Sequence, residues 1–152
     1  MSLVALSYVS LADANNYMQF HPKRLVWERG TGDQQTMCLT QATRDIDGLA
    51  LKGRRKTVEQ ALRFPRQDQE TVPDDILRAT ILIAVEYIGG KDPEMEFNQL
   101  SLVGERYTSL SRSRNPDLIE PHIAAGIISF EAFALLQPYL RSDDAIRLTR
   151  IS

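Results

Sequence analysis

The feature that most constrains the fold is a long apolar segment at residues 72–90, VPDDILRATILIAVEYIGG. Pro73 suits the first turn of a helix, where its missing N–H is not needed, and the acidic pair at 74 and 75 lies at the positive end of the helix dipole. Gly89 and Gly90 end the segment. Its apolar residues cover more than one face, which indicates a helix packed on several sides: Ile76, Leu77, Ile81, Leu82, Ile83, Val85 and Ile88. The sequence therefore predicts a mainly α protein, a small bundle of about four helices.

Three other segments carry helical signals. The first begins at Ser10, an N-cap residue with Asp13 three positions on, and ends before Pro22. The second runs over residues 33–47, with apolar residues at helical spacing. The last begins at Ser129 and is limited by Pro138. A long ordered loop with one helical turn at 58–62 is expected between the second and main helices, and a short strand or extended arm near residues 99–108.

These elements suggest a helical core over residues 1–95, followed at 96–152 by the arm, the C-terminal helix and a tail, within one structural domain overall.

Lys and Arg total 18 against 20 Asp and Glu, which gives a net charge of −2. This balance argues against a protein whose main task is to coat nucleic acid. The single cysteine, Cys38, cannot form an internal disulfide, and no signal peptide or membrane-length apolar run is seen. A cytosolic setting, or a particle assembled there, is expected.

Residues that could carry out chemistry are few. His21, His122 and Cys38 do not share a spacing typical of zinc sites. The carboxylate pairs at 45/47 and 74/75 lie at expected helix ends, where capping accounts for them. We therefore expect no enzyme activity, no metal and no cofactor.

The loop between the second and main helices contains the triplet Phe64-Pro65-Arg66. Ring closure fixes the φ angle of Pro65, and the proline favours an extended conformation at Phe64. The pattern predicts that Phe64 fills an apolar slot between helices while Arg63 and Arg66 point outward. Val72 and Pro73 are expected to stiffen the far end of the loop.

The basic residues leave two interpretations open. One group surrounds the triplet (Arg54, Arg55, Lys56, Arg63 and Arg66), a second is Arg112 and Arg114, and a third is Arg141, Arg147 and Arg150. They could bind the phosphates of single-stranded DNA, with Phe64 or Tyr107 stacking on bases. Acidic neighbours such as Glu59, Asp68 and Glu70 would cancel much of that charge, so ion pairs and interface hydrogen bonds are the favoured interpretation.

The order of motifs resembles a known family. SLADANNYM is followed by LTQATRDIDGLALKGRR, then QALRFPR, VPDDILRATILIAVEYI and an extended LSLVGERY. Over residues 8–108 this is similar to the head–tail connector (adaptor) proteins of long-tailed bacteriophages, in the subgroup named for DnaT-like single-stranded-DNA binding. This chain has Ile46 where the family usually has leucine, and the resemblance extends poorly to residues 109–152.

The resemblance implies a structural virion protein that does no chemistry. Its copies, commonly about twelve, would form a ring between the portal protein and the tail or its terminator, at the virion neck, after assembly in the host cytoplasm. Double-stranded DNA would pass through without sequence-specific binding. The expected interface and loop anchors are Arg54, Arg55, Arg63, Phe64, Pro65, Arg66, Val72 and Pro73.

Two further contacts are expected from residue type. The arm, with Leu100, Leu102, Arg106 and Tyr107, could pair with a strand edge of a neighbouring copy. Arg141, Arg147 and Arg150 in the tail could reach an acidic portal surface. The alternative function is a single-stranded-DNA-binding protein of a phage.

Overall fold

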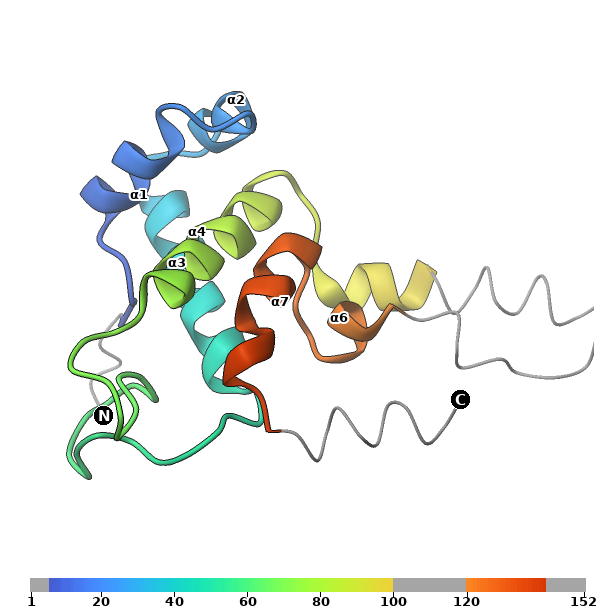
Figure 1. The fold of residues 1–152 in the computed structure, drawn as a ribbon. Helices are drawn as coiled ribbons and strands as arrows, with labels where there is room; N and C mark the ends of the chain where they lie inside the picture. The colour runs from blue at the N-terminus through green and yellow to red at the C-terminus, as the bar shows by residue number, and fades with distance from the viewer. Residues whose placement is uncertain (1–5, 100–119, 142–152) are drawn as a thin grey trace, which may run out of the picture.

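A computed structural model describes residues 6–99 and 120–141 of the chain. Within these residues the regular structure is helical, apart from two isolated β-bridges, so the predicted mainly α fold is confirmed (Figure 1). Residues 93–99 are also helical. The other helices are α1 (Leu11–Met18), α2 (Arg24–Glu28), α3 (Gly32–Asp47), α4 (Asp74–Ile88), α6 (Pro121–Ala124), α7 (Phe130–Leu136) and a 3₁₀ turn (Gln137–Tyr139).

The predicted main helix, α4, lies at the centre of the bundle. Both α3 and α7 pack against it, and α2 contacts it as well. A continuous run of its side chains, Ala79 to Val85, is buried. This is the arrangement expected of a helix whose apolar residues cover more than one face.

Local capping signals set several helix starts. The Ser10 hydroxyl accepts a hydrogen bond from the Asp13 backbone N–H at 3.2 Å, and Ser129 accepts one from Ala132 at 3.1 Å. Both predicted helix starts are therefore confirmed. The second predicted helix begins at Gly32, because Thr31 and Gln34 form a reciprocal capping box before it.

Other predictions were incomplete or wrong. The five-residue helix α2 was not predicted; its Trp27 is buried, and the indole Nε1 donates to Asn15 Oδ1 at 2.8 Å. The expected helical turn at residues 58–62 is wrong, since this stretch consists of turns and bends. The arm predicted at Leu100–Tyr107 lies outside the described residues.

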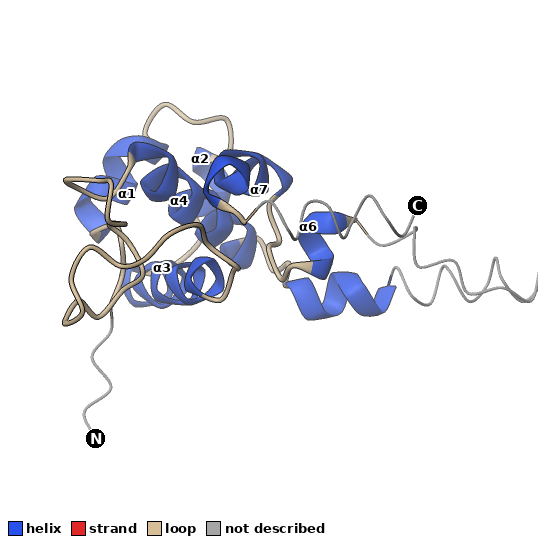
Figure 2. Ribbon diagram, turned by 60° about the horizontal axis from the view of Figure 1, so that its bottom comes forward, coloured by secondary structure: helices blue, strands red, loops and turns tan. Residues whose placement is uncertain are grey.

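The connection between α3 and α4 folds over one end of the bundle. Its beginning pairs with the chain that follows α7: Lys52 N–H donates to the Tyr139 carbonyl at 2.8 Å, and Arg141 N–H donates to the Ala50 carbonyl at 3.0 Å. Two views show this connection at the end of the molecule opposite to α6 (Figures 1 and 2). None of the helices in the described ranges is long and apolar enough to span a membrane.

Candidate functional site: the braced basic loop

The loop anchors predicted from the sequence run from Arg54 to Pro73, and most of them lie in the loop formed by residues 52–67, called here the basic loop. Phe64 is only 2% exposed, and its ring makes edge contacts with Tyr8 and Tyr139 at centroid distances of 6.0 and 5.7 Å. The Phe64 backbone N–H donates to the Tyr8 hydroxyl, and the Phe64-Pro65 peptide bond is cis. The predicted burial of Phe64 is confirmed, and this ring anchors the loop to the body of the protein.

Arg66 does not point outward, which corrects the prediction from the sequence. Its side chain is buried, and the guanidinium donates to the carbonyls of Lys52 (2.9 Å) and Gly53 and, at 3.0 Å, to the carbonyl of Arg63. Burial lowers the pKa of Arg66, and the neighbouring guanidinium groups of Arg63 and Arg55 lower it further. Arg66 is thus a clamp that joins the two sides of the loop, because a guanidinium can donate in several directions at once.

Arg63 is also turned toward the protein. Its Nη1 donates to the Leu49 carbonyl at 3.3 Å, and its backbone N–H donates to Asp47 Oδ2 at 3.3 Å. Asp47 accepts a second bond from the Tyr8 hydroxyl. Burial raises the pKa of Asp47, although these two hydrogen bonds oppose the rise. The expectation that Arg63 points outward is therefore wrong as well.

Backbone hydrogen bonds close the loop into a narrow projection. Lys56 N–H donates to the Pro65 carbonyl at 3.0 Å, and Gln67 N–H donates to the Arg54 carbonyl at 2.9 Å. Inside the turn, the Gln60 side-chain amide donates to the carbonyls of residues 62 and 65. Val58 at the apex is 96% exposed. The loop is therefore ordered by its own contacts and presents one apolar side chain at its tip.

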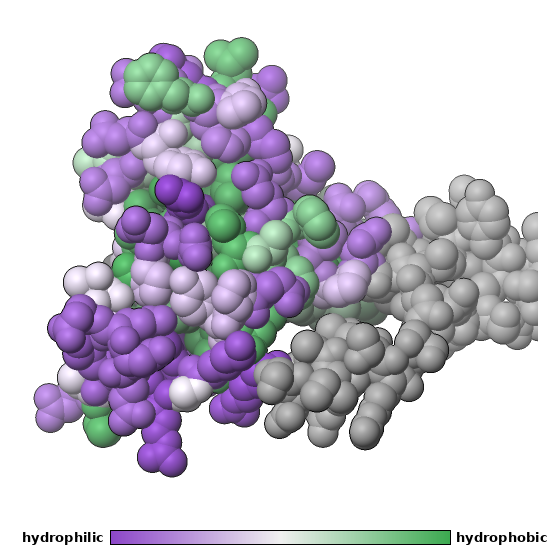
Figure 3. Space-filling view, viewed as in Figure 1, coloured by the Kyte–Doolittle hydropathy of each residue, from purple (hydrophilic) through white to green (hydrophobic). Residues whose placement is uncertain are grey.

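The charge around this projection is basic. Arg54 and Arg55 are exposed, and neither forms an ion pair with any residue in the described parts of the chain. Lys56 is the exception, since its Nζ lies 3.2 Å from Glu70 Oε2. The surface over this end is strongly polar (Figure 3). Of the predicted ion pairs, Lys56–Glu70 is the one present among the described residues, whereas the guanidinium groups of Arg63 and Arg66 donate to backbone carbonyls.

The remaining predicted residues are placed as follows. Val72 is half-buried, and Pro73 is the extended residue immediately before α4. Arg141 Nε donates to the Leu51 carbonyl at 3.0 Å, which ties this residue to the base of the loop. The other predicted arm and tail residues lie outside the described residues: Leu100, Leu102, Arg106, Tyr107, Arg112, Arg114, Arg147 and Arg150.

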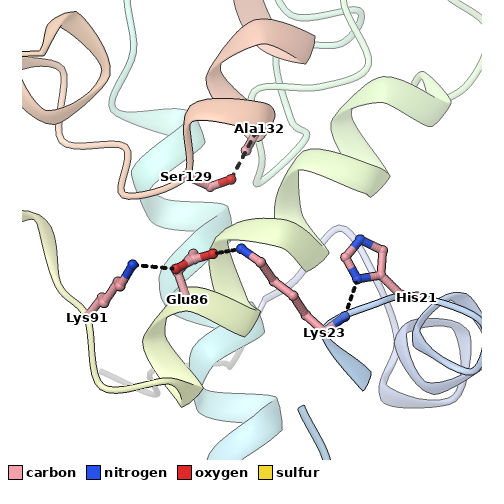
Figure 4. A network of polar contacts seen from close by, with 6 residues as sticks. All are labelled: His21, Lys23, Glu86, Lys91, Ser129 and Ala132. Carbon is pink, nitrogen blue, oxygen red and sulfur yellow. Dashed lines mark hydrogen bonds and ion pairs between the residues drawn. The ribbon is translucent and has the colours of Figure 1, made fainter. Parts of the chain in front are cut away.

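A second surface feature, not predicted from the sequence, is a hollow of about 480 Å³ between the ends of α4, α6 and α7. At its edge the Glu86 carboxylate lies between the ammonium groups of Lys23 and Lys91 (Figure 4). His122 packs against Phe130, and burial lowers the pKa of its imidazole. No local pattern reveals this hollow, because its lining comes from four separate segments of the chain.

A family model matches about two thirds of the chain. Residues 4–106 match the model of the family described as "Putative DnaT-like ssDNA binding protein". No curated protein and no solved structure matches the chain. The family description favours the single-stranded-DNA-binding interpretation over the connector interpretation. Because the match covers more than half of the chain, from before α1 to beyond α4, the protein belongs to this DnaT-like family.

Proposed function

We propose that this protein is a structural subunit of a phage particle, a head–tail connector whose copies form a ring between portal and tail. The observation that carries this proposal is that Phe64 and Arg66 of the Phe64-Pro65-Arg66 triplet make their contacts within the protein. Phe64 is buried, and the Arg66 guanidinium donates to three carbonyls of the loop. The motif that carries the resemblance therefore serves to fix the shape of a projection, which is what a subunit needs to meet its neighbours at a repeatable angle.

Exposed apolar side chains also support this proposal. Val58 stands at the tip of the basic loop, and Phe20 and Leu25 are exposed at the turn and short helix after α1. Exposed apolar groups on rigid supports suit protein interfaces, because little side-chain freedom is lost on binding. Under this proposal the partners are the portal protein, the tail or its terminator, and further copies of this chain. The genome would pass through the ring without base-specific contacts.

The test is to purify intact particles of the phage that encodes this chain and to image their neck. We expect the chain to be present in the particles as a closed ring at the portal vertex, commonly of about twelve copies. Mass spectrometry of the same particles should detect the chain in proportion to the portal protein. Particles with a complete neck that lack this chain would contradict the proposal.

The second candidate function is binding of single-stranded DNA, and two observations favour it. The family description names that activity, and Arg54 and Arg55 are exposed and lack an ion pair within the described residues. Binding would have to rely on phosphate contacts at the loop. Of the two aromatic residues expected to stack on bases, Phe64 is buried and Tyr107 lies outside the described residues. The hydroxyls of Tyr8 and Tyr139 donate hydrogen bonds to Asp47 and Asp75.

A salt titration separates the two functions. A single-stranded-DNA-binding protein should bind fluorescent oligo-dT with an affinity that falls steeply with salt, with a slope of about −0.7 for each phosphate contacted. Replacing Arg54 and Arg55 with glutamine should then reduce the slope by roughly 1.4, since two contacts are lost. The matched control replaces Arg29 and Arg78, two exposed arginines outside the loop. The connector proposal predicts no salt-dependent binding of a short oligonucleotide by the wild type.

A further inference from the structure

Two surface features at opposite ends of the molecule complement one another. The basic loop projects from one end, and α6 lies toward the other (Figures 1 and 2). Residues of α6 line the hollow. One is a convex projection with an apolar apex and two exposed arginines at its base, and the other is a concave surface lined by four glutamates and two lysines. A chain with two complementary surfaces at opposite ends can bind a copy of itself head to tail.

The tip is small and already ordered. Val58 provides an apolar apex that is 96% exposed. Arg54 and Arg55 flank the base of the projection as exposed cations. The hydrogen bonds across the loop hold this arrangement before any partner binds. Binding therefore does not have to order the loop, a cost that would otherwise weaken a small interface.

The hollow offers the matching groups. Its apolar floor includes Ile123 and Ile128, and Phe130 at its edge is 68% exposed. Glu120 and Glu131 also line it, are exposed, and form no ion pair with any residue of the described ranges. The half-buried Glu86, by contrast, already pairs with Lys23 and Lys91. The unpaired carboxylates are thus the ones available to a cationic partner.

We propose that copies of this chain associate head to tail, with the basic loop of one copy seated in the hollow of the next. Val58 would enter the apolar floor, and Arg54 and Arg55 would face Glu120 and Glu131. The inference rests on the proposed connector function, since it names the surfaces through which the ring would close. Such a contact joins two different surfaces, so it produces a ring when the rotation per copy closes and a filament when it does not.

Disulfide trapping tests this contact even when it is weak. In a Cys38→Ser background, Val58→Cys and Phe130→Cys place one thiol at the tip and one at the hollow. Mild oxidation should yield a ladder of linked multimers on a non-reducing gel. The matched control keeps Val58→Cys and replaces Phe20, which is 90% exposed at another site, with cysteine. A control ladder of equal strength would overturn the proposal, because it would show random collision.

Charge-reversal variants test whether the crosslinking depends on opposite charges at the basic loop and the hollow. Arg54→Glu/Arg55→Glu should abolish the ladder, and so should Glu120→Lys/Glu131→Lys. Mixing the two reversed proteins should restore it, because each acidic tip then meets a lysine-bearing hollow and each basic tip meets an acidic hollow. The substituted side chains are exposed, so folding should be unchanged by circular dichroism. A ladder that persists in both reversed proteins, or that is not restored on mixing, would overturn the proposal.

The outcomes also separate this inference from the function on which it rests. A ring seen in particles without tip-to-hollow crosslinks would overturn the inference and leave the connector function standing. Crosslinks that respond to charge, in a protein absent from particles, would overturn the connector function and leave the self-association standing. Loss of the ladder on adding oligo-dT would instead assign the basic loop to nucleic acid.

Discussion

Replacing Phe64 with alanine is expected to lower the free energy of unfolding by about 3–5 kcal/mol, the usual range for a buried aromatic residue. The ring is 2% exposed and contacts Tyr8 and Tyr139, which come from opposite ends of the described chain. Its removal leaves a cavity where three segments meet. Thermal or urea unfolding measures the effect, and the melting temperature should fall by roughly 10 °C or more.

The matched control for this change is Phe20→Ala. Phe20 is the same residue type but is 90% exposed, so its replacement should change the stability by less than about 0.5 kcal/mol. Equal stabilities of the two variants would show that Phe64 does not anchor the loop.

Replacing Arg66 with methionine is expected to destabilise the protein by about 2–4 kcal/mol, because hydrogen bonds to a charged group are lost and carbonyl groups are left without donors. Methionine keeps much of the length of the side chain but none of its donors. Relief of repulsion from Arg55 and Arg63 offsets part of the loss. The change in unfolding free energy should be measured in urea, with wild type and variant compared at the same pH.

Arg54→Met is the control for Arg66→Met. The Arg54 side chain is exposed and makes no hydrogen bond or ion pair within the described residues, so a change within about 0.5 kcal/mol is expected. If Arg54→Met proved as destabilising as Arg66→Met, the stabilising role assigned to the buried guanidinium would be wrong.

The helices that could be predicted from the sequence are those with local signals. α4 has a long apolar pattern and a proline before it, and Ser10 and Ser129 bond to backbone N–H groups three residues away. By contrast, α2 is five residues long, less than two turns, so no hydrophobic period can be recognised in it. The capping box at Thr31 involves only neighbouring residues and could have been found from its spacing.

The candidate site was only partly predictable, because some of its contacts join segments that are distant in the sequence. The burial of Phe64 follows from an apolar ring beside a rigid proline. The orientation of Arg66 does not, because arginine is usually exposed and its acceptors at Lys52 and Gly53 are brought near only by the fold. The hollow depends on the packing of segments distant in the chain, and no short stretch of sequence encodes it.

The basic loop is a fixed projection, and its Phe64-Pro65-Arg66 triplet makes its contacts within the protein. Amide hydrogen exchange tests it most directly, because Lys56 and Gln67 donate their N–H groups across the loop at 3.0 and 2.9 Å. We expect these two amides to exchange roughly a hundredfold or more slowly than in an unstructured peptide, while the amide of Val58 at the exposed apex exchanges fast. Exchange of Lys56 and Gln67 at the unstructured rate would contradict the claim.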